Sequence, residues 1–162
     1  MISVDILKQV ILDNQHDVER QIVIPRSVNL DEGMNYVLVG VRRAGKSFML
    51  YHWMQQNSQQ GIGWDKMLYI NFEDERLINM ESSELNLLLE AFARIYANDR
   101  PILFLDELQN VVGWEKFARR LADSKFRVYI TGSNARMLSA EIATTLGGRY
   151  IMKEVYPYSF AE

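Results

Sequence analysis

The stretch GVRRAGKS at residues 40–47 has the residue types and spacing that phosphate binding needs: Gly, four residues, Gly, Lys, Ser. Gly40 and Gly45 allow successive backbone N–H groups to point inward, and a helix starting here adds the positive end of its dipole. Lys46 is long enough to reach β and γ phosphates, and Ser47 offers an oxygen to Mg²⁺. We therefore expect a nucleotide site, against the plainer alternative of a strand-to-helix turn with a surface lysine. The expected nucleotide contacts are Gly40, Arg42, Arg43, Ala44, Gly45, Lys46, Ser47 and Phe48.

Two acids, Asp106 and Glu107, follow the apolar run ILFL at residues 102–105. Ligands of open parallel sheets bind beyond the carboxyl ends of the strands, which is also where a phosphate loop begins. Asp106 is positioned to hold the Mg²⁺ shell opposite Ser47, and Glu107 to orient an attacking water or accept its proton. The alternative is a pair of solvent-facing acids at a strand end. Together with the phosphate loop, the pair predicts a metal ligand and a catalytic base.

The elements that must position these residues can be predicted from periodicity. Short apolar runs typical of buried parallel strands alternate with helical patterns. This alternation predicts one parallel sheet covered by helices on both faces. The expected strands are 36–40, 66–74, 100–107, 126–133 and 149–155. The expected helices are 3–19, 46–60, one capped by Ser83, one across 114–122 and one at 135–144.

The composition is that of an ordinary globular protein. The chain has 162 residues, of which 48% are hydrophobic and 24% charged, and it suits one compact domain. A net charge of −3 gives no overall basic footprint for nucleic acid. The absence of cysteine excludes disulfides and thiolate metal sites. No stretch approaches the ~20 apolar residues of a membrane span, so we expect a cytoplasmic protein.

As a set, the motifs resemble those of one family. GVRRAGKS, YINFED, LDELQN, ITGSNA, LGGRY and the closing YPYSF occur in this order in a family of bacterial and archaeal AAA+-like ATPases. The resemblance extends from about residue 20 to residue 162. It implies a P-loop NTPase three-layer α/β sandwich, with ATP and Mg²⁺ as ligands. Lys46, Ser47, Asp106 and Glu107 then have the roles given above.

The order of the motifs implies the AAA+/ASCE type of this fold. One expected strand, 66–74, lies between the phosphate-loop strand and the strand that ends in Asp106 and Glu107. By resemblance, this implies a five-stranded parallel sheet of order 5-1-4-3-2 and an adjacent glutamate as catalytic base. A GTPase is disfavoured because the sequence has no Asn-Lys-x-Asp stretch to recognise guanine.

In AAA+ ATPases a polar residue at the end of the fourth strand contacts the γ-phosphate or the attacking water. Asn134 matches that position best, and Thr131 and Ser133 are its neighbours. The alternative is a strand that leaves the sheet through a Gly-Ser-Asn turn, which turn chemistry alone would favour.

Arg149 follows two glycines in LGGRY, where related ATPases carry a finger arginine. Such an arginine enters a neighbouring subunit's site and stabilises the transition state, which implies a homo-oligomer. Arg136 is the rival candidate. The alternative for Arg149 is a solvated side chain or one paired with an acid at residues 73–75.

The resemblance also sets the expected domain organisation. Residues 1–30 form an N-terminal helix and an extended lead-in, and residues 31–162 form the ATPase core. Residues 20–26 would lie near the adenine. Family members continue into a helical lid and a nuclease-like C-terminal domain, which we expect to be missing from this chain. The expected partners are therefore ATP or ADP and that domain or a partner protein; nucleic acid is not indicated.

Three functions compete. The first is an ATPase that powers or switches an attached domain, with weak affinity and slow turnover because the lid is missing. The second is a nucleotide-binding signalling switch with little hydrolysis. The third is a small-molecule kinase. It ranks last because the adjacent Asp106 and Glu107 suit water activation, and only Arg136 and Arg149 lie where an arginine-rich lid is needed.

Overall fold

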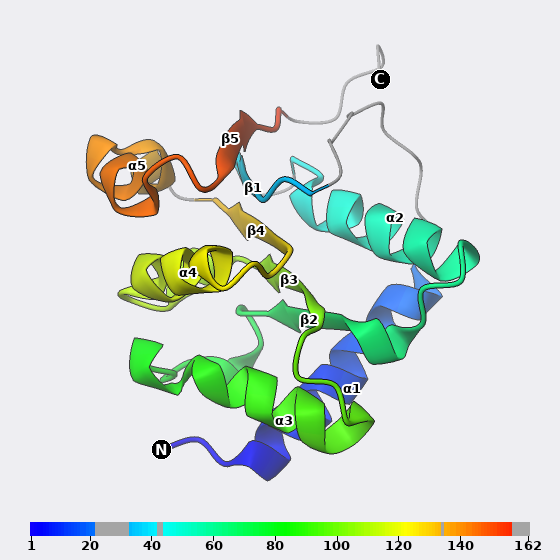
Figure 1. Ribbon diagram of the computed structural model, residues 1–162. Coiled ribbons are helices and arrows are strands. Elements are labelled where there is room, and N and C mark those ends of the chain that lie inside the picture. Colours follow the sequence, from blue (N-terminus) through cyan, green and yellow to red (C-terminus); the bar gives the residue numbers. More distant parts are fainter. Residues whose placement is uncertain (22–32, 42–43, 134, 157–162) are drawn as a thin grey trace.

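The computed structural model describes residues 1–21, 33–41, 44–133 and 135–156 (Figure 1). Helices and strands alternate along these ranges. The helices are α1 (Val4–Arg20), α2 (Lys46–Gln59), α3 (Asn86–Tyr96), α4 (Trp114–Asp123) and α5 (Ala140–Leu146). The strands are β1 (Tyr36–Val39), β2 (Met67–Asn71), β3 (Ile102–Asp106), β4 (Val128–Gly132) and β5 (Ile151–Glu154). Short 3-10 turns are at Trp64–Lys66, Glu75–Leu77, Ser82–Glu84, Leu108–Asn110 and Ala135–Leu138.

The five strands form one parallel sheet of order β2-β3-β4-β1-β5. Reversed, this is the predicted order 5-1-4-3-2, so the predicted topology is confirmed. Because every strand runs the same way, all the strands have their carboxyl ends on the same side of the sheet. The phosphate loop after β1 and the acids at the end of β3 therefore both lie at the carboxyl ends of the strands, with β4 between them.

Helices cover both faces of the sheet, as predicted: α2 lies on one side, and α3, α4 and α5 on the other (Figure 1). Successive strand residues point to opposite faces, which divides the core into two clusters. Val37 and Leu103 pack in the cluster with α3, α4 and α5. Leu38 and Phe104, the next residues along the same strands, pack in the cluster with α2. The molecule is thus a three-layer α/β sandwich.

Helix α1 covers β2, which is an edge strand of the sheet formed by the described residues. Asn14 Oδ1 accepts a hydrogen bond from the Asn71 N–H at 2.9 Å. Gln15 Nε2 donates to the carbonyl oxygens of Trp64 and Met67, both at 3.0 Å. Both amide side chains are about 95% buried, since Asn14 is 5% and Gln15 4% exposed. They satisfy backbone groups that an open sheet edge would leave to water or to another chain.

Every predicted strand is present, but the strands are shorter than expected. The strand predicted at 66–74 ends at Asn71 because its side chain turns the chain: Asn71 Oδ1 accepts from the Glu73 N–H at 2.9 Å. Asp74 then caps the 3-10 turn that follows by accepting from the Arg76 N–H. The acidic stretch expected at the end of this strand therefore lies in a turn.

The predicted helix cap at Ser83 is wrong. Glu81 and Glu84 form a capping box around the 3-10 turn Ser82–Glu84, and α3 begins only at Asn86. The helix predicted at 135–144 divides in two, because the Ser139 side chain accepts from the Ile142 N–H and starts α5 as a new helix.

The predicted domain boundary between residues 30 and 31 and the extended lead-in lie outside the described residues. No helix within the described ranges is long and apolar enough to cross a membrane.

Candidate nucleotide-binding site

The two glycines of the phosphate loop are required by the backbone around them. The Gly40 N–H donates to the Gly132 carbonyl oxygen of β4 at 3.2 Å. A Cβ atom at Gly40 would collide with the carbonyl oxygen of Val155. Gly45 has φ +91°, in the left-handed region that favours glycine, and directly precedes α2. The loop therefore passes closely between neighbouring strands and delivers the chain into the helix.

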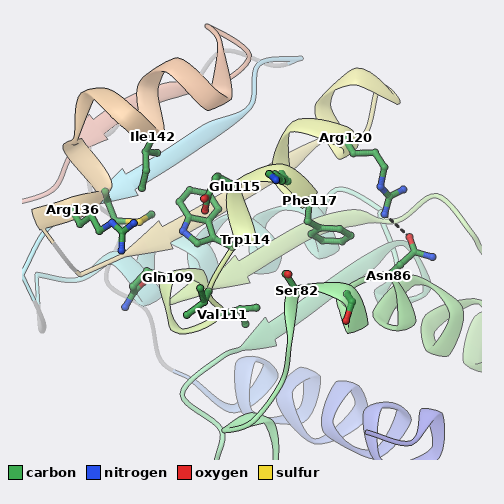
Figure 2. Close-up of a pocket in the computed structure, with 15 residues that line it drawn as sticks. Ser82, Asn86, Gln109, Val111, Trp114, Glu115, Phe117, Arg120, Arg136 and Ile142 are labelled. Carbon is green, nitrogen blue, oxygen red and sulfur yellow. Dashed lines mark hydrogen bonds between the residues drawn. The ribbon is translucent and has the colours of Figure 1, made fainter. Parts of the chain in front are cut away.

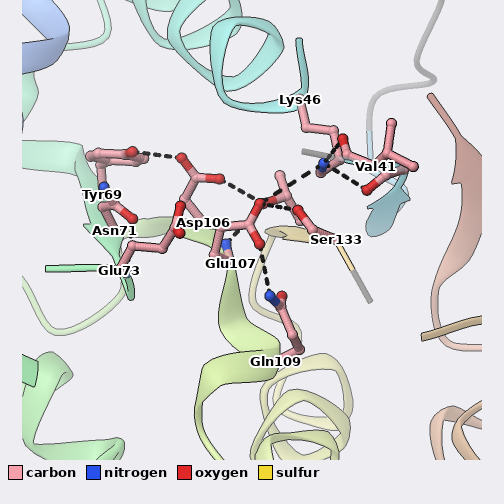
Figure 3. A network of polar contacts seen from close by, with 11 residues as sticks. Val41, Lys46, Tyr69, Asn71, Glu73, Asp106, Glu107, Gln109 and Ser133 are labelled. Atoms are coloured by element: carbon pink, nitrogen blue, oxygen red, sulfur yellow. Dashed lines mark hydrogen bonds and ion pairs between the residues drawn. The ribbon is translucent and has the colours of Figure 1, made fainter. Parts of the chain in front are cut away.

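Lys46 is the first residue of α2 and is 3% exposed. Its ammonium group donates to the carbonyl oxygens of Gly40 and Val41, both at 2.8 Å. The same Nζ atom lies 3.9 Å from Glu107 Oε1 (Figure 3). A buried cation thus lies between the carbonyl groups of the loop and the carboxylate beyond β3.

Asp106 ends β3 and is 1% exposed. Its Oδ1 accepts from the Thr131 hydroxyl at 2.6 Å, and its Oδ2 accepts from the Tyr69 hydroxyl at 2.7 Å. The Ser47 side chain also hydrogen-bonds to it. Burial raises the pKa of Asp106, while these hydrogen bonds oppose the rise because they favour the charged form. A carboxylate that is costly to ionise in this way gains strongly from a nearby cation.

Glu107 has φ +58° and is 5% exposed. A left-handed conformation costs a non-glycine residue about 1–2 kcal/mol and persists only where the surroundings hold it. Here its Oε1 accepts from the Ser133 hydroxyl at 2.6 Å and its Oε2 from Gln109 Nε2 at 2.7 Å (Figure 3). Its N–H donates to the Thr131 hydroxyl at 2.9 Å. The strained backbone thus directs a carboxylate with one hydrogen bond on each oxygen toward Lys46.

Thr131, at the centre of this network, is fully buried on β4. Its hydroxyl accepts from the Glu107 N–H and donates to Asp106, so one group fixes both acids. From the sequence, Thr131 is expected only as a neighbour of Asn134, and Tyr69 is not among the predicted site residues. A signal for Tyr69 exists, because a tyrosine in a buried apolar strand needs a partner for its hydroxyl.

Arg149 lies at the other end of the sheet. It precedes β5 and forms an ion pair with Asp123, which ends α4, with Nε 2.5 Å from Oδ1. Tyr36, the first residue of β1, pairs with Ile151, whereas the phosphate loop follows the last residue of β1. Arg149 therefore cannot reach the phosphate loop of its own chain, and its acidic partner is not one of residues 73–75.

The remaining expected contacts divide into two groups. Ala44 is buried in the loop, and Phe48 is 46% exposed and packs edge-on against Tyr51. Arg42, Arg43 and Asn134 lie outside the described residues. So do residues 22–26 near the expected adenine position, and residues 157–162.

The sheet order, together with the glycine loop between β1 and α2, defines a P-loop NTPase fold. A family model described as an AAA domain matches residues 33–162, and the chain belongs to this family. The resemblance inferred from the motifs is thereby confirmed.

Two relatives extend this comparison. An uncharacterized protein of Methanocaldococcus jannaschii is 43% identical over 159 residues, which cover 97% of this chain and 34% of that protein. An uncharacterized protein of Haemophilus influenzae is 40% identical over 129 residues, which cover 78% of this chain and 32% of that protein. The chain thus spans about a third of the length of these relatives.

Proposed function

We propose that this chain is the ATPase module of a longer protein, which binds ATP with Mg²⁺ and hydrolyses it to power or switch an attached domain or partner. The observation that carries the proposal is the convergence of three buried charges. Lys46 lies 3.9 Å from Glu107, and Glu107 and Asp106 share the Thr131 hydroxyl. Membership of the AAA domain family supports a nucleotide-binding, ATPase-like module.

In this proposal Lys46 exchanges the carbonyl oxygens of Gly40 and Val41 for oxygens of the β and γ phosphates. The backbone N–H groups at the start of α2 face the same phosphates. The exchange is favourable because a phosphate carries full negative charge, whereas a carbonyl oxygen carries only a partial one.

The oxygens of Ser47 and Asp106 fit Mg²⁺, which prefers hard oxygen ligands and keeps several waters. The described residues contain no group of three or more His, Cys, Asp or Glu side chains that could hold a metal by themselves. This suits a cation that takes its other ligands from phosphates and water. When bound, the ion neutralises charge on the transferring phosphoryl group.

Glu107 is the proposed base, which orients the attacking water and takes up its proton. Each of its carboxylate oxygens accepts one hydrogen bond, from Ser133 or from Gln109, and keeps a further lone pair for the water. We assign Ser133 and Asn134, which follow β4, to the γ-phosphate and the attacking water. Arg149 is proposed to act in the site of a neighbouring copy.

A signalling switch with little hydrolysis is the second candidate, and one observation favours it. Both carboxylate oxygens of Glu107 are already hydrogen-bonded, by Ser133 and by Gln109. A carboxylate fixed by two hydrogen bonds is less free to reorient toward an attacking water molecule. The same geometry therefore supports tight control of turnover.

The test is phosphate release from Mg-ATP over a range of protein concentrations, with Glu107→Gln as the inactive variant and the exposed Glu90→Gln as the matched control. We expect Glu107→Gln to bind ATP but to lose at least about a hundredfold in rate, the scale of general-base catalysis. Lys46→Ala should lose nucleotide binding itself. Equal rates of phosphate release for the wild type and Glu107→Gln would reject the proposed hydrolysis and would favour the signalling switch. Unchanged ATP binding by Lys46→Ala would reject the proposed nucleotide-binding site.

A further inference from the structure

A second pocket lies on the opposite face of the sheet from α2, among α4, α5 and the 3-10 turns Ser82–Glu84 and Ala135–Leu138 (Figure 2). Its volume is about 700 Å³, within the range of about 300–1,000 Å³ that is usual for ligand sites. Trp114, Phe117 and Ile142 give it an apolar lining and are themselves mostly buried. The pocket can therefore take up an apolar or aromatic group without rearranging the core.

The charge around this pocket is positive. Among the described residues that line it, Lys116, Arg120 and Arg136 are cations and Glu115 is the single acid. The whole chain carries a net charge of −3, so the positive rim is a local feature. Beside it, Val112 is 89% exposed. An apolar lining with a basic rim is complementary to an acidic segment that carries an apolar side chain.

Gln109 connects the pocket to the acids. Its Nε2 donates to Glu107 Oε2 at 2.7 Å, and the same side chain lines the pocket beside Arg136 (Figures 2 and 3). Its Oε1 is enclosed and finds no hydrogen-bond donor among the described residues. A buried acceptor without a donor costs about 1–3 kcal/mol. Rotating the amide by half a turn would bring that oxygen against the carboxylate, so the unsatisfied oxygen is a consequence of holding Glu107.

We propose that this pocket docks an acidic segment of a partner protein. An apolar or aromatic side chain of the segment enters the pocket, and its carboxylates meet Lys116, Arg120 and Arg136. Docking displaces the side chains that enclose Gln109 Oε1, so that a donor of the segment reaches it. That hydrogen bond polarises the amide and strengthens its bond to Glu107, because linked hydrogen bonds reinforce one another. Gln109 is then a positioning residue through which the docked segment slows hydrolysis; this coupling rests on the proposed role of Glu107, whereas docking does not.

Docking is tested with a fluorescein-labelled peptide, Glu-Glu-Leu-Phe-Glu-Glu, by anisotropy at low salt. We expect Arg120→Glu and Lys116→Glu each to weaken binding about tenfold, or about 1.4 kcal/mol. Arg119→Glu, which makes the same charge change on the same helix but does not line the pocket, should bind like the wild type. No binding to the wild type, equal binding by all variants, or equal binding of a Lys-Lys-Leu-Phe-Lys-Lys peptide would overturn the proposal.

Coupling is tested with Gln109→Leu, which keeps the approximate shape but removes the hydrogen bond to Glu107. Saturating peptide should lower kcat for phosphate release several-fold in the wild type with little change in KM for ATP. The variant should bind the peptide within about threefold of the wild type, yet its kcat should no longer respond. An unchanged wild-type kcat, or an equal response in the variant, would overturn the coupling. If the wild type released no phosphate at all, the proposed function and the coupling would fall together, and docking would still be decided by peptide binding.

Discussion

Thr131 shows how one hydroxyl can set the properties of two acids. It donates to Asp106 and accepts from the backbone of Glu107, and it is fully buried. The two acids therefore differ in environment although they are adjacent in sequence. Asp106 is enclosed by the hydroxyls of Thr131 and Tyr69, whereas Glu107 turns back toward Lys46. This difference is the physical basis for proposing a metal ligand and a base at neighbouring positions.

Thr131→Val keeps the volume of the side chain but removes both hydrogen bonds. It should lower the free energy of unfolding by about 1–3 kcal/mol, because the Glu107 N–H loses its acceptor in a buried site. Phosphate release should fall as well, and Thr131→Ser should restore both properties. Urea unfolding measures the first effect, with the exposed Thr144→Val as control. A Thr131→Val protein as stable and active as the wild type would contradict this account.

Asp106→Asn should make the nucleotide-free protein more stable at pH ~8, by roughly 1 kcal/mol. Burial raises the folded-state pKa of Asp106 above its unfolded-state value. The contribution of the protonated side chain to the stability of the folded state is therefore complete below the unfolded-state pKa. It is lost as the pH rises through the folded-state pKa. The asparagine does not titrate, and the difference between the two proteins should close toward pH ~4. Urea unfolding across this range tests it, with the exposed Asp99→Asn as control. A difference that grows as pH falls would reverse the sign and reject the argument.

At the scale of elements, α1 is part of the fold, although it precedes the region matched by the family model. Leu7, Val10 and Ile11 pack in the main core, and Gln15 bonds to the backbone at the edge of β2. The Tyr96 hydroxyl of α3 donates to Gln15 Oε1 at 2.6 Å, so a single amide joins two helices and a strand. The first helix thus closes the sheet edge that is farthest from β1.

Gln15→Ala should lower the free energy of unfolding by about 2–3 kcal/mol. The change removes the donor from the buried carbonyl oxygen of Met67 and from the partly buried carbonyl oxygen of Trp64. Gln9→Ala, on the exposed side of the same helix, should cost less than about 0.5 kcal/mol. Thermal and urea unfolding measure both variants. Equal costs would mean that α1 does not satisfy the edge of β2.

At the scale of the whole molecule, the site and Arg149 lie at opposite ends of the strands. An arginine held by Asp123 at the amino end of the sheet can complete a phosphate site only on another copy of the chain. The ion pair is partly exposed, so it contributes little stability and can be given up on assembly. The chain spans about a third of its relatives, and the further parts of those proteins are proposed to direct such assembly.

Arg149→Ala should therefore affect hydrolysis through assembly. In the wild type, phosphate release per chain should rise with protein concentration. In the variant it should stay low at every concentration. At saturating protein concentration, the rate of the variant should be lower than that of the wild type by a factor on the order of 10³. Arg94→Ala, which removes a surface arginine paired with Glu90, is the control. A wild-type specific activity that is constant over all concentrations would exclude a role for Arg149 in trans.

The sequence alone determined the parts of this protein that depend on local order along the chain. The alternation of apolar runs and helical patterns predicted the parallel sheet, because this pattern extends over many residues. The strand order was implied only by the resemblance of the motifs to a known family, since no local pattern specifies which strands become neighbours. The spacing in residues 40–47 predicted a phosphate loop, and the structure places its described residues between β1 and α2. Their contacts with a nucleotide stay a prediction. Several element ends differ from the predicted ones, because single side chains such as Ser139 decide them.

Only the tertiary structure decided which side chains meet. Tyr69 on β2 and Thr131 and Ser133 at the end of β4 are distant in sequence from the two acids, and they converge on Asp106 and Glu107 because the strands are parallel and in this order. The left-handed backbone of Glu107 and the distance of Arg149 from the phosphate loop follow from the same packing. Such contacts depend on strand register and side-chain direction, which no local pattern in the sequence encodes.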